Sequence, residues 1–170
     1  MEAHPSSECE TLLLSTLTHT HHTRLFLAST DDGSNRLNVT NNVVVSGGLW
    51  KDGIANSHKH YQGNVELFGQ NCFNSGQWDQ GSSNFTDNHC FQTAPSSFNC
   101  KCNRSTGNPP CPTIERNHYY QQNQTYSVCG KTLPELQSAG FEQGSTVAEV
   151  PPNAEIMELV KTTLLGAAGI

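Results

Sequence analysis

The chain is poor in charge, and above all in positive charge. Only 14% of its 170 residues are charged, and nine Lys or Arg stand against fifteen Asp or Glu, which gives a formal net charge of −6. A protein that binds nucleic acid or an anionic membrane surface needs a basic stripe, so the composition excludes both partners. We therefore expect neutral ligands, or acidic ligands that are bridged by cations.

Hydrophobic residues are also scarce, at 34% of the chain, whereas Asn, Gln, Ser, Thr and Gly are abundant. This balance is typical of all-β solenoids and secreted proteins rather than of helical bundles. No apolar run is long enough to span a membrane. The length is that of one domain, so we expect a single continuous core.

The first thirty residues lack the features of a secretory signal peptide. Their apolar stretch, TLLLSTL, is short, is flanked by Glu, and is followed by His and Thr without a small-residue cleavage site. We interpret residues 1–30 as an atypical, poorly ordered N-terminal segment. Many β-solenoid proteins are nevertheless secreted with a signal peptide. The alternative is therefore a secreted protein whose true N-terminus lies upstream of this sequence.

Seven cysteines are distributed unevenly along the chain. Their density favours disulfides formed in an oxidising compartment, and we expect a secreted or extracellular protein. The odd number leaves at least one thiol over, for which Cys9 is the candidate. The alternative is a zinc site made by Cys100, Cys102, Cys111 and His118, but this stretch lacks the C-x2-C spacing of a zinc knuckle.

A repeat organises the centre of the chain. Four segments share the order apolar-x-x-Asn-(Val or His), and their asparagines are 22, 24 and 29 residues apart. Each spacing matches one coil of a solenoid, with loops inserted on one side in the longer coils. An antiparallel sandwich, the alternative, would not require Asn at matched positions. The sequence thus predicts an all-β parallel β-helix of about four coils, defined by Asn42, Asn64, Asn88 and Asn117.

The recurring Asn has two expected roles. It can turn the chain between two strands, because its side chain mimics a backbone turn and tolerates the left-handed conformation. Stacked copies can also hydrogen-bond to one another as a ladder. We expect the apolar residue three positions before each Asn, and those two and three positions after it, to point into the interior.

The remaining segments divide the chain into parts. Residues 31–130 are expected to form the β-helix coils, with a Cys/Pro-rich excursion at 99–112 that disulfides hold in place. Residues 131–170 are expected to form a helical cap, because a helix over the last coil would block its unpaired strand edges. A short helix is expected near Leu133 and Leu136, and a longer one after Pro151-Pro152, where apolar residues recur at helical spacing. These residues are Ile156, Leu159, Val160 and Leu164.

Five motifs stand in order along the chain: Asp31-Asp32-Gly33-Ser34, Asn41-Asn42, Gly47-Gly48 with Lys51-Asp52, His58 with His60, and Gly140-x-Glu142-x-Gly144-Ser145. In this order they resemble right-handed β-helix proteins of the pectin-lyase-like superfamily, over approximately residues 30–165. The resemblance implies a right-handed parallel β-helix. The superfamily includes polysaccharide lyases, hydrolases, epimerases and non-catalytic adhesins, so the resemblance indicates the fold better than the function.

The loop at residues 47–60 gathers the reactive side chains that a uronic-acid lyase needs. Such an enzyme uses a base to remove a proton, a cation to neutralise the sugar carboxylate, and an aromatic surface to hold the ring. Lys51, His58 or His60 could act as the base. Lys59 could supply the positive charge, and Trp50 could form the stacking surface.

Glycoside hydrolysis is the second catalytic hypothesis. It requires two carboxyl groups roughly 5–10 Å apart, and residues of successive coils stack about 4.8 Å apart. Asp31, Asp32 and Asp52 are the candidates for this pair.

Each of these residues also has a purely structural interpretation. The Asp31-Asp32-Gly33-Ser34 segment is a strong turn signal, and the 47–60 loop could be a solvated connection between coils. His89 and His118, which follow a ladder Asn, are expected to be structural members of the stack. The cluster of His19, His21 and His22 is expected to have no specific role.

No cofactor is expected, although Ca²⁺ could bind between coils through Asp79, Asp87 and Glu66. Two functions follow from the sequence. The first is a secreted protein that acts on or binds extracellular polysaccharide, as a lyase or hydrolase if it is an enzyme. The alternative is a non-catalytic structural or adhesive solenoid, possibly a fragment of a longer β-helix. The two differ in whether the reactive side chains meet in one concave groove.

Overall fold

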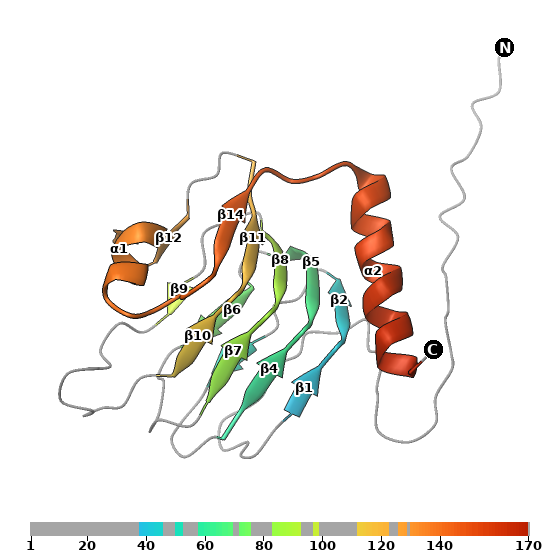
Figure 1. The fold of residues 1–170 in the computed structure, drawn as a ribbon, viewed down its shortest axis with the longest axis horizontal. Coiled ribbons are helices and arrows are strands. Elements are labelled where there is room, and N and C mark those ends of the chain that lie inside the picture. The colour runs from blue at the N-terminus through green and yellow to red at the C-terminus, as the bar shows by residue number, and fades with distance from the viewer. Residues whose placement is uncertain are drawn as a thin grey trace, which may run out of the picture.

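The structure is a computed structural model, shown in Figure 1. It describes residues 38–45, 50–52, 58–69, 72–75, 83–92, 97–98, 112–122, 126–128 and 130–169. For residues 50–52, 73–75, 97–98 and 167–168 the description is limited to the backbone. The expected N-terminal segment at 1–30 and the excursion at 99–112, apart from Pro112, lie outside the described residues.

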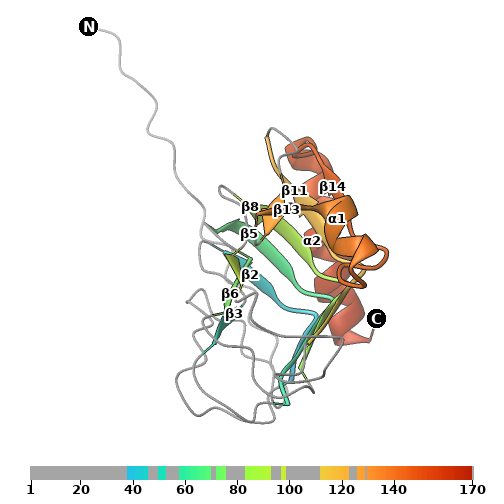
Figure 2. The ribbon, with the colours of Figure 1, turned by 90° about the vertical axis from the view of Figure 1, so that its left-hand side faces the viewer.

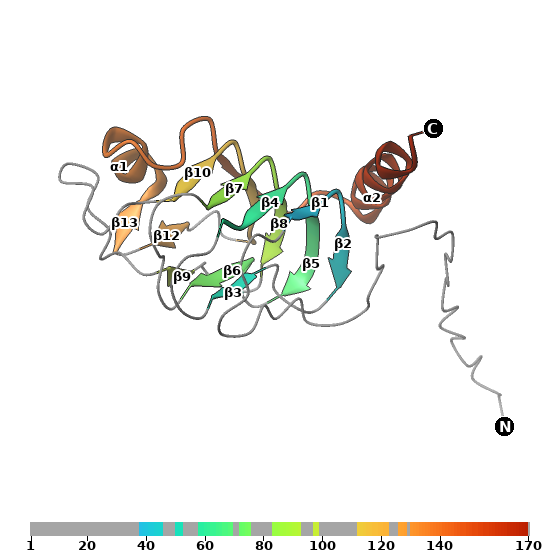
Figure 3. The same cartoon turned by 90° about the horizontal axis from the view of Figure 1, so that it is seen from below.

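Twelve short β-strands form three parallel sheets in the described part of the chain (Figures 1 and 3). The four-stranded sheet contains β1 (Asn38–Thr40), β4 (His60–Gln62), β7 (Asn84–Thr86) and β10 (Thr113–Glu115). The five-stranded sheet contains β2 (Val43–Val45), β5 (Val65–Gly69), β8 (His89–Gln92), β11 (His118–Tyr120) and β14 (Thr146–Ala148). The three-stranded sheet contains β3 (Trp50–Asp52), β6 (Phe73–Ser75) and β9 (Ser97–Phe98). The prediction of an all-β chain with stacked repeats and a C-terminal helix is confirmed at this level.

The remaining elements lie near the C-terminus. A short antiparallel pair is formed by β12 (Ser127–Val128) and β13 (Lys131–Thr132). It is followed by helix α1 (Leu133–Ser138), and helix α2 (Asn153–Ala168) comes after β14. No helix among the described residues is long and apolar enough to cross a membrane.

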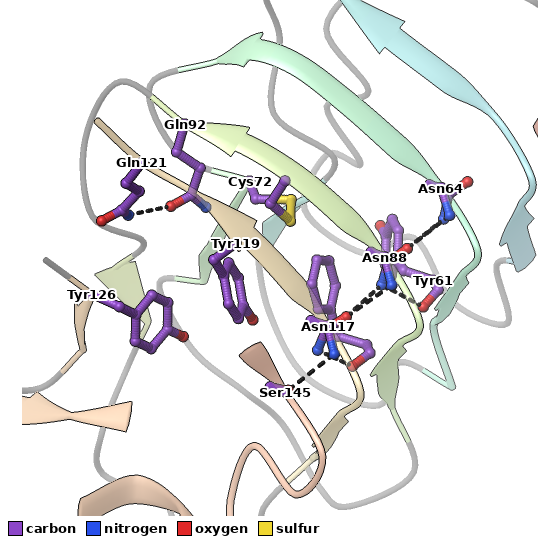
Figure 4. Close-up of a disulfide and its surroundings, with 12 residues drawn as sticks. Tyr61, Asn64, Cys72, Asn88, Gln92, Asn117, Tyr119, Gln121, Tyr126 and Ser145 are labelled. Atoms are coloured by element: carbon purple, nitrogen blue, oxygen red, sulfur yellow. Dashed lines mark hydrogen bonds between the residues drawn. A yellow bond between two sulfur atoms is a disulfide. The ribbon is translucent and has the colours of Figure 1, made fainter. Parts of the chain in front are cut away.

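The predicted asparagine ladder is present and joins the repeats (Figure 4). The side-chain oxygen of Asn88 accepts hydrogen bonds from the backbone N–H and the side-chain Nδ2 of Asn64, both at 3.0 Å. Asn117 accepts the same pair of bonds from Asn88, at 3.0 and 3.1 Å. Asn42 donates the corresponding pair to Asn64, at 2.9 and 3.2 Å. Each Nδ2 also donates to a backbone carbonyl, which fixes the side chain in place.

The residue that turns the chain is not the ladder Asn, as we had predicted, but the residue before it. The positions that precede the ladder residues have a left-handed backbone, with φ between 53° and 72°. They are Asn41, Gly63, Asp87, Arg116 and Gly144. The turn and the ladder use different residues for a physical reason. The side chain of the ladder Asn must point along the stack toward the next repeat, and a positive φ at that residue would turn the side chain away from this direction.

The interior follows the alternation of β-strands. The residues three before each ladder Asn form one inward row, and those two after it form another, as predicted. The first row contains Val39, Tyr61, Phe85 and Ile114, and the second contains Val44, Glu66, Cys90 and Tyr119. The residues three after each Asn, however, face outward, because neighbouring residues of a strand point to opposite faces. Our prediction for that position was wrong.

Helix α2 covers this outward face of the five-stranded sheet. Its residues Ile156, Leu159 and Val160 pack against Val65, Leu67, Phe91 and neighbouring side chains. Figure 1 shows α2 beside β2, at the opposite end of the stack from α1. We expected residues 131–170 to lie over the last repeat. The structure places α2 of this segment against β2 and β5. Helix α1 lies at the last repeat, where Gln137 donates to the carbonyls of Glu142 and Ser145.

The stack also contains a fifth repeat, which the sequence pattern did not reveal. Strand β14 pairs in parallel with β11, and Gln143 forms an isolated bridge with Glu115. Ser145 takes the place of the ladder Asn and accepts a hydrogen bond from the backbone N–H of Asn117 at 2.9 Å. The pattern was missed because a hydroxyl replaces the amide at this position.

The ladder predicts the effect of removing one side chain from its centre. Asn88→Ala removes the acceptor of two buried donors of Asn64 and the donor of a bond to Asn117. Each buried polar group without a partner costs about 1–3 kcal/mol. We therefore expect the free energy of unfolding to fall by roughly 3–5 kcal/mol in chemical denaturation. Gln122→Ala, at an exposed turn, is the control and should change stability by less than about 0.5 kcal/mol. Equal stability of the two variants would contradict the role of the ladder.

Candidate functional site

The side chains predicted for catalysis come from different parts of the fold. Lys51 and Asp52, with Trp50, belong to β3 of the three-stranded sheet, where only the backbone is described. His60 belongs to β4 of the four-stranded sheet, and His58 lies just before it with an exposed side chain. Asp31 and Asp32 lie outside the described residues. The described residues therefore do not test whether these side chains converge, and their convergence stays a prediction.

Lys59 is fully buried, with 0% of its surface exposed. Its backbone N–H donates to the Ser83 hydroxyl at 3.3 Å, and its carbonyl accepts from Asn84. The role that we expected for Lys59, which was to neutralise a substrate carboxylate, stays a prediction.

The outward face of the four-stranded sheet carries a continuous row of polar side chains. Asn38, His60, Asn84 and Thr113 occupy the same register position in successive strands. The side-chain amide nitrogen of Asn84 lies 3.0 Å from Nδ1 of His60, so that imidazole nitrogen accepts the amide hydrogen. His60 and Asn84 are half-buried, which leaves polar atoms of this row at the surface.

A charged network lies beside this row. Arg116 contacts the Asp87 carboxylate through Nε at 2.8 Å and through Nη2 at 3.0 Å, and it binds Glu115 at 2.9 Å. The side-chain amide of Gln62 donates to Asp87 at 3.3 Å. The hydrogen bond from Arg116 is the main reason that the pKa of Asp87 lies below its usual range.

We call the polar row on the four-stranded sheet and the charged network of Arg116 together the polar track. It consists of Asn38, His60, Gln62, Asn84, Asp87, Thr113, Glu115 and Arg116. Of these, the sequence singled out His60 as a candidate catalytic residue and Asp87 as a candidate Ca²⁺ ligand. A signal for the rest was present, because the position before the apolar residue and the two positions after it are polar or Gly in each of the four aligned repeats. We assigned these positions no shared role.

A column of aromatic rings occupies part of the outward face of the five-stranded sheet. The rings of His89 and His118 stack with centroids 4.6 Å apart, and Tyr120 stacks on Phe91 at 4.3 Å. Burial, and then the charge of His118, lower the pKa of His89 to about 4. His89 is thus neutral near neutral pH and lies within hydrogen-bonding distance of the Tyr120 hydroxyl, at 3.2 Å. These contacts agree with the structural role expected for the two histidines.

Two carboxyl groups lie inside the stack. Glu142 accepts hydrogen bonds from the hydroxyls of Tyr119, Tyr126 and Ser145, at 2.9, 2.7 and 2.6 Å (Figure 4 shows all three hydroxyl residues). Burial nevertheless raises its pKa. Glu66 is fully buried, and no donor within the described residues makes a hydrogen bond of regular geometry to its carboxyl oxygens.

The environment of Glu66 holds it in the neutral form. Burial raises its pKa to about 8, and the nearby backbone amide of Gly69 lowers it by a smaller amount. Gly69 permits this contact, because a Cβ at that position would clash with the Glu66 carboxyl. Such a pKa suits a general acid or base. Glu66 is, however, enclosed in the inward row between Val44 and Cys90, where no substrate can reach it.

Two of the three residues suggested for Ca²⁺ lie within the described ranges, in different surroundings. Glu66 lies in the interior, Asp87 binds Arg116 on the surface, and Asp79 lies outside the described residues. Within the ranges that the structure describes, no three His, Cys, Asp or Glu side chains form a group that could hold a metal ion. Calcium binding therefore stays a prediction.

One pair of cysteines forms a disulfide. Cys72 and Cys90 are both buried, and their Cα atoms are 5.5 Å apart. Cys90 lies on the inward row of β8, so the bond ties the segment before β6 to the interior (Figure 4). The other five cysteines, including Cys9, lie outside the described residues.

Glu66 generates a prediction about pH. Between about pH 4.5 and 8 the folded protein keeps a proton that the unfolded chain has lost. The free energy of unfolding therefore falls as the pH rises through this range, by up to roughly 5 kcal/mol at ~1.36 kcal/mol per pKa unit. In Glu66→Gln this loss should be absent. Denaturant titrations of both proteins at pH 5 and pH 8.5 measure the difference.

The control for this experiment is Glu155→Gln, which changes an exposed carboxyl at the start of α2. It should keep the pH dependence of the unmodified protein. If Glu66→Gln loses stability with rising pH as steeply as this control, Glu66 is ionised at neutral pH and our assignment fails.

Comparison with known proteins adds no family assignment. No protein-family model matches the chain, and no curated protein or solved structure matches it. The resemblance to pectin-lyase-like proteins therefore stays a prediction, and the functional argument depends on the geometry of the described residues.

Proposed function

We propose that this protein is an extracellular right-handed parallel β-helix that binds polysaccharide along the polar track without cleaving it. The observation that carries the proposal is the continuous row of polar side chains on the four-stranded sheet. Amide, imidazole, carboxylate and guanidinium groups can all exchange hydrogen bonds with sugar hydroxyls. The track offers every one of these groups on a single face.

The repeat of the sheet supports an extended ligand. Neighbouring strands lie about 4.8 Å apart, which is comparable to the length of one pyranose ring. Equivalent side chains of successive strands can therefore meet successive sugars of a linear chain. A deep pocket is not needed to bind such a ligand, because many weak contacts along the polysaccharide add up.

Charge favours a neutral polysaccharide over an acidic one. Asp87 and Glu115 provide two carboxylates, and Arg116, which binds both, provides one positive charge. The track therefore carries a net negative charge, in line with the formal net charge of −6 for the whole chain. A uronate polymer would be repelled unless cations bridged it to the track.

The pKa values and the burial of the described carboxyl groups fit binding without cleavage. A glycosidase needs one carboxylic acid with a raised pKa beside the scissile bond. The pKa of Asp87 is lowered, whereas the described carboxyls with raised pKa values, Glu66 and Glu142, are buried in the interior. The part of the track that the structure describes therefore lacks a general acid.

Two further observations support the fold and the location. In the three larger sheets each strand pairs in parallel with the equivalent strand of the next repeat, and connections between parallel strands are right-handed in about 98% of cases. The Cys72–Cys90 disulfide fits an oxidising, extracellular compartment.

Binding is tested with the full chain and a panel of a neutral β-glucan, a galactomannan and polygalacturonate, by affinity electrophoresis or calorimetry. We expect binding to a neutral polymer. His60→Ala and Asn84→Ala should each weaken it about five- to tenfold, since each removes roughly one hydrogen bond of about 1 kcal/mol. Thr162→Ala on α2, far from the track, should bind as the unmodified protein does. No binding to any polymer, or equal loss in all three variants, would reject the track and favour the structural solenoid.

Catalysis is tested separately by following the absorbance of unsaturated products and the release of reducing ends from the same polymers. We expect neither product to form, at pH values from 5 to 9 and with or without added Ca²⁺. Turnover that disappears in Lys51→Ala or His58→Ala would instead assign the lyase function predicted from the sequence.

A further inference from the structure

Two histidines lie side by side on the outward face of the five-stranded sheet. His89 of β8 and His118 of β11 are register partners, and their imidazole rings stack with centroids 4.6 Å apart and 22° between their planes. Both side chains are half-buried, so part of each ring is at the surface. The pair therefore presents two imidazoles at one place on the stack.

The ladder fixes the backbone of both histidines in the same way. Each histidine directly follows a ladder Asn, and its own N–H donates to the carbonyl of the Asn in the preceding repeat, at 2.8 Å. His89 donates to Asn64, and His118 donates to Asn88. Since the same bond holds both positions, the two side chains leave neighbouring strands at equivalent points. A site that is built on paired strands is more precise than a site on loops.

A hydroxyl group lies against Nδ1 of each ring. Nδ1 of His89 is 3.2 Å from the Tyr120 hydroxyl, and Nδ1 of His118 is 2.9 Å from the hydroxyl oxygen of Thr146. A hydroxyl oxygen can accept the Nδ1 hydrogen, and the lone pair of the neutral imidazole is then on Nε2. Histidines that bind metal ions are held in this way, with one ring nitrogen on the ion and the other donating to a polar group.

The row that contains the two histidines changes its chemistry along the stack. It begins with Val43 and Val65, where helix α2 packs against β2 and β5, and it continues with His89, His118 and Thr146. Figure 2 views the stack from its β14 end, with α1 in front of the strands and α2 behind them. The part of the row beside α2 is thus apolar, whereas the part toward α1 carries nitrogen and oxygen atoms.

We propose that His89 and His118 bind one divalent transition-metal ion, Zn²⁺ or Cu²⁺, through their Nε2 atoms. Imidazole nitrogen suits these ions, whereas Ca²⁺ and Mg²⁺ prefer oxygen ligands. A nitrogen that binds zinc lies about 2.0–2.1 Å from the ion, so two nitrogens on one ion are at most about 4.2 Å apart. This limit is close to the 4.6 Å between the ring centroids, and a small rotation of the two side chains meets it.

Two protein ligands leave the other coordination positions of the ion open. Water completes them, as in zinc sites that keep an open position. Such a site agrees with the finding that no three His, Cys, Asp or Glu side chains form a group within the described ranges. The hydroxyls of Tyr120 and Thr146 do not touch the ion, and they act as positioning groups for the two rings. The site is independent of the polar track, which lies on a different sheet.

The test is a titration of the full chain with Zn²⁺, followed through the imidazole nitrogen chemical shifts in NMR. The chain has eight histidines, so the measurement must resolve each of them. We expect Nε2 of His89 and Nε2 of His118 to shift with the same apparent affinity, and Mg²⁺ to shift neither. His89→Ala should weaken zinc binding at His118 by about 100-fold, because a ligand contributes at least as much as the groups that orient it. His58→Ala, which removes an exposed histidine outside the pair, is the matched control and should leave the affinity unchanged.

Tyr120→Phe tests a positioning group without removing a ligand. The ring that stacks on Phe91 stays, whereas the hydroxyl beside His89 is lost, and we expect the zinc affinity of the pair to fall about tenfold. A hydroxyl with a purely structural role would leave this affinity unchanged. The backbone amide of His118, which donates to Asn88 in the middle of the stack, reports by its protection from hydrogen exchange whether each variant is folded.

The proposal is overturned if Zn²⁺ shifts neither histidine, or if His58→Ala weakens zinc binding at the pair as much as His89→Ala does. Shifts of His89 and His118 with clearly different affinities would also overturn it, since each imidazole would then bind an ion by itself. Because Tyr120→Phe keeps both imidazoles, it tests the site even if an alanine variant does not fold. None of these outcomes depends on polysaccharide binding.

Discussion

The hydrogen bonds between stacked asparagines are the constraint on which the rest of this structure depends. Each ladder side chain supplies both a donor and an acceptor within the buried stack, and no other residue of its length does both through a planar amide. Asp would lack the donor, and Ser ends the ladder because its single hydroxyl passes the bond to Glu142. Since each Asn also fixes a carbonyl of an earlier strand, the ladder sets the register of the sheets on both sides of it.

The same constraint explains what the sequence could predict. A residue type that is required at one place in every repeat leaves a periodic trace, so Asn42, Asn64, Asn88 and Asn117 could be aligned before any strand was known. Two inward rows could be counted from those positions, whereas the residues three after each Asn were wrongly expected inside, because neighbouring residues of a strand alternate between faces. The fifth repeat left no such trace, because Ser145 replaces the amide. The left-handed residues were missed for a similar reason, since Asn41, Gly63, Asp87 and Arg116 share a conformation and no common side chain.

Candidate sites were harder to predict than the fold. Residues that are close in sequence belong to different sheets, since Lys51 lies in β3 and His60 in β4. Side chains that are 24 to 29 residues apart lie side by side instead, as His60 and Asn84 or Asp87 and Arg116 do. In stacked repeats, chemical neighbours are found by comparing equivalent positions rather than by scanning along the chain.

The unequal steps of the ladder have a consequence for how such a chain can change. The same pair of hydrogen bonds joins asparagines that are 22, 24 and 29 residues apart, so the connections between repeats differ in length while the contacts at the ladder do not. The spacing between neighbouring repeats is therefore set by the ladder, whereas the number of residues that connects them varies. Insertions in those connections can add new surface without shifting a single strand partner, whereas the loss of one amide would disturb every row that it aligns.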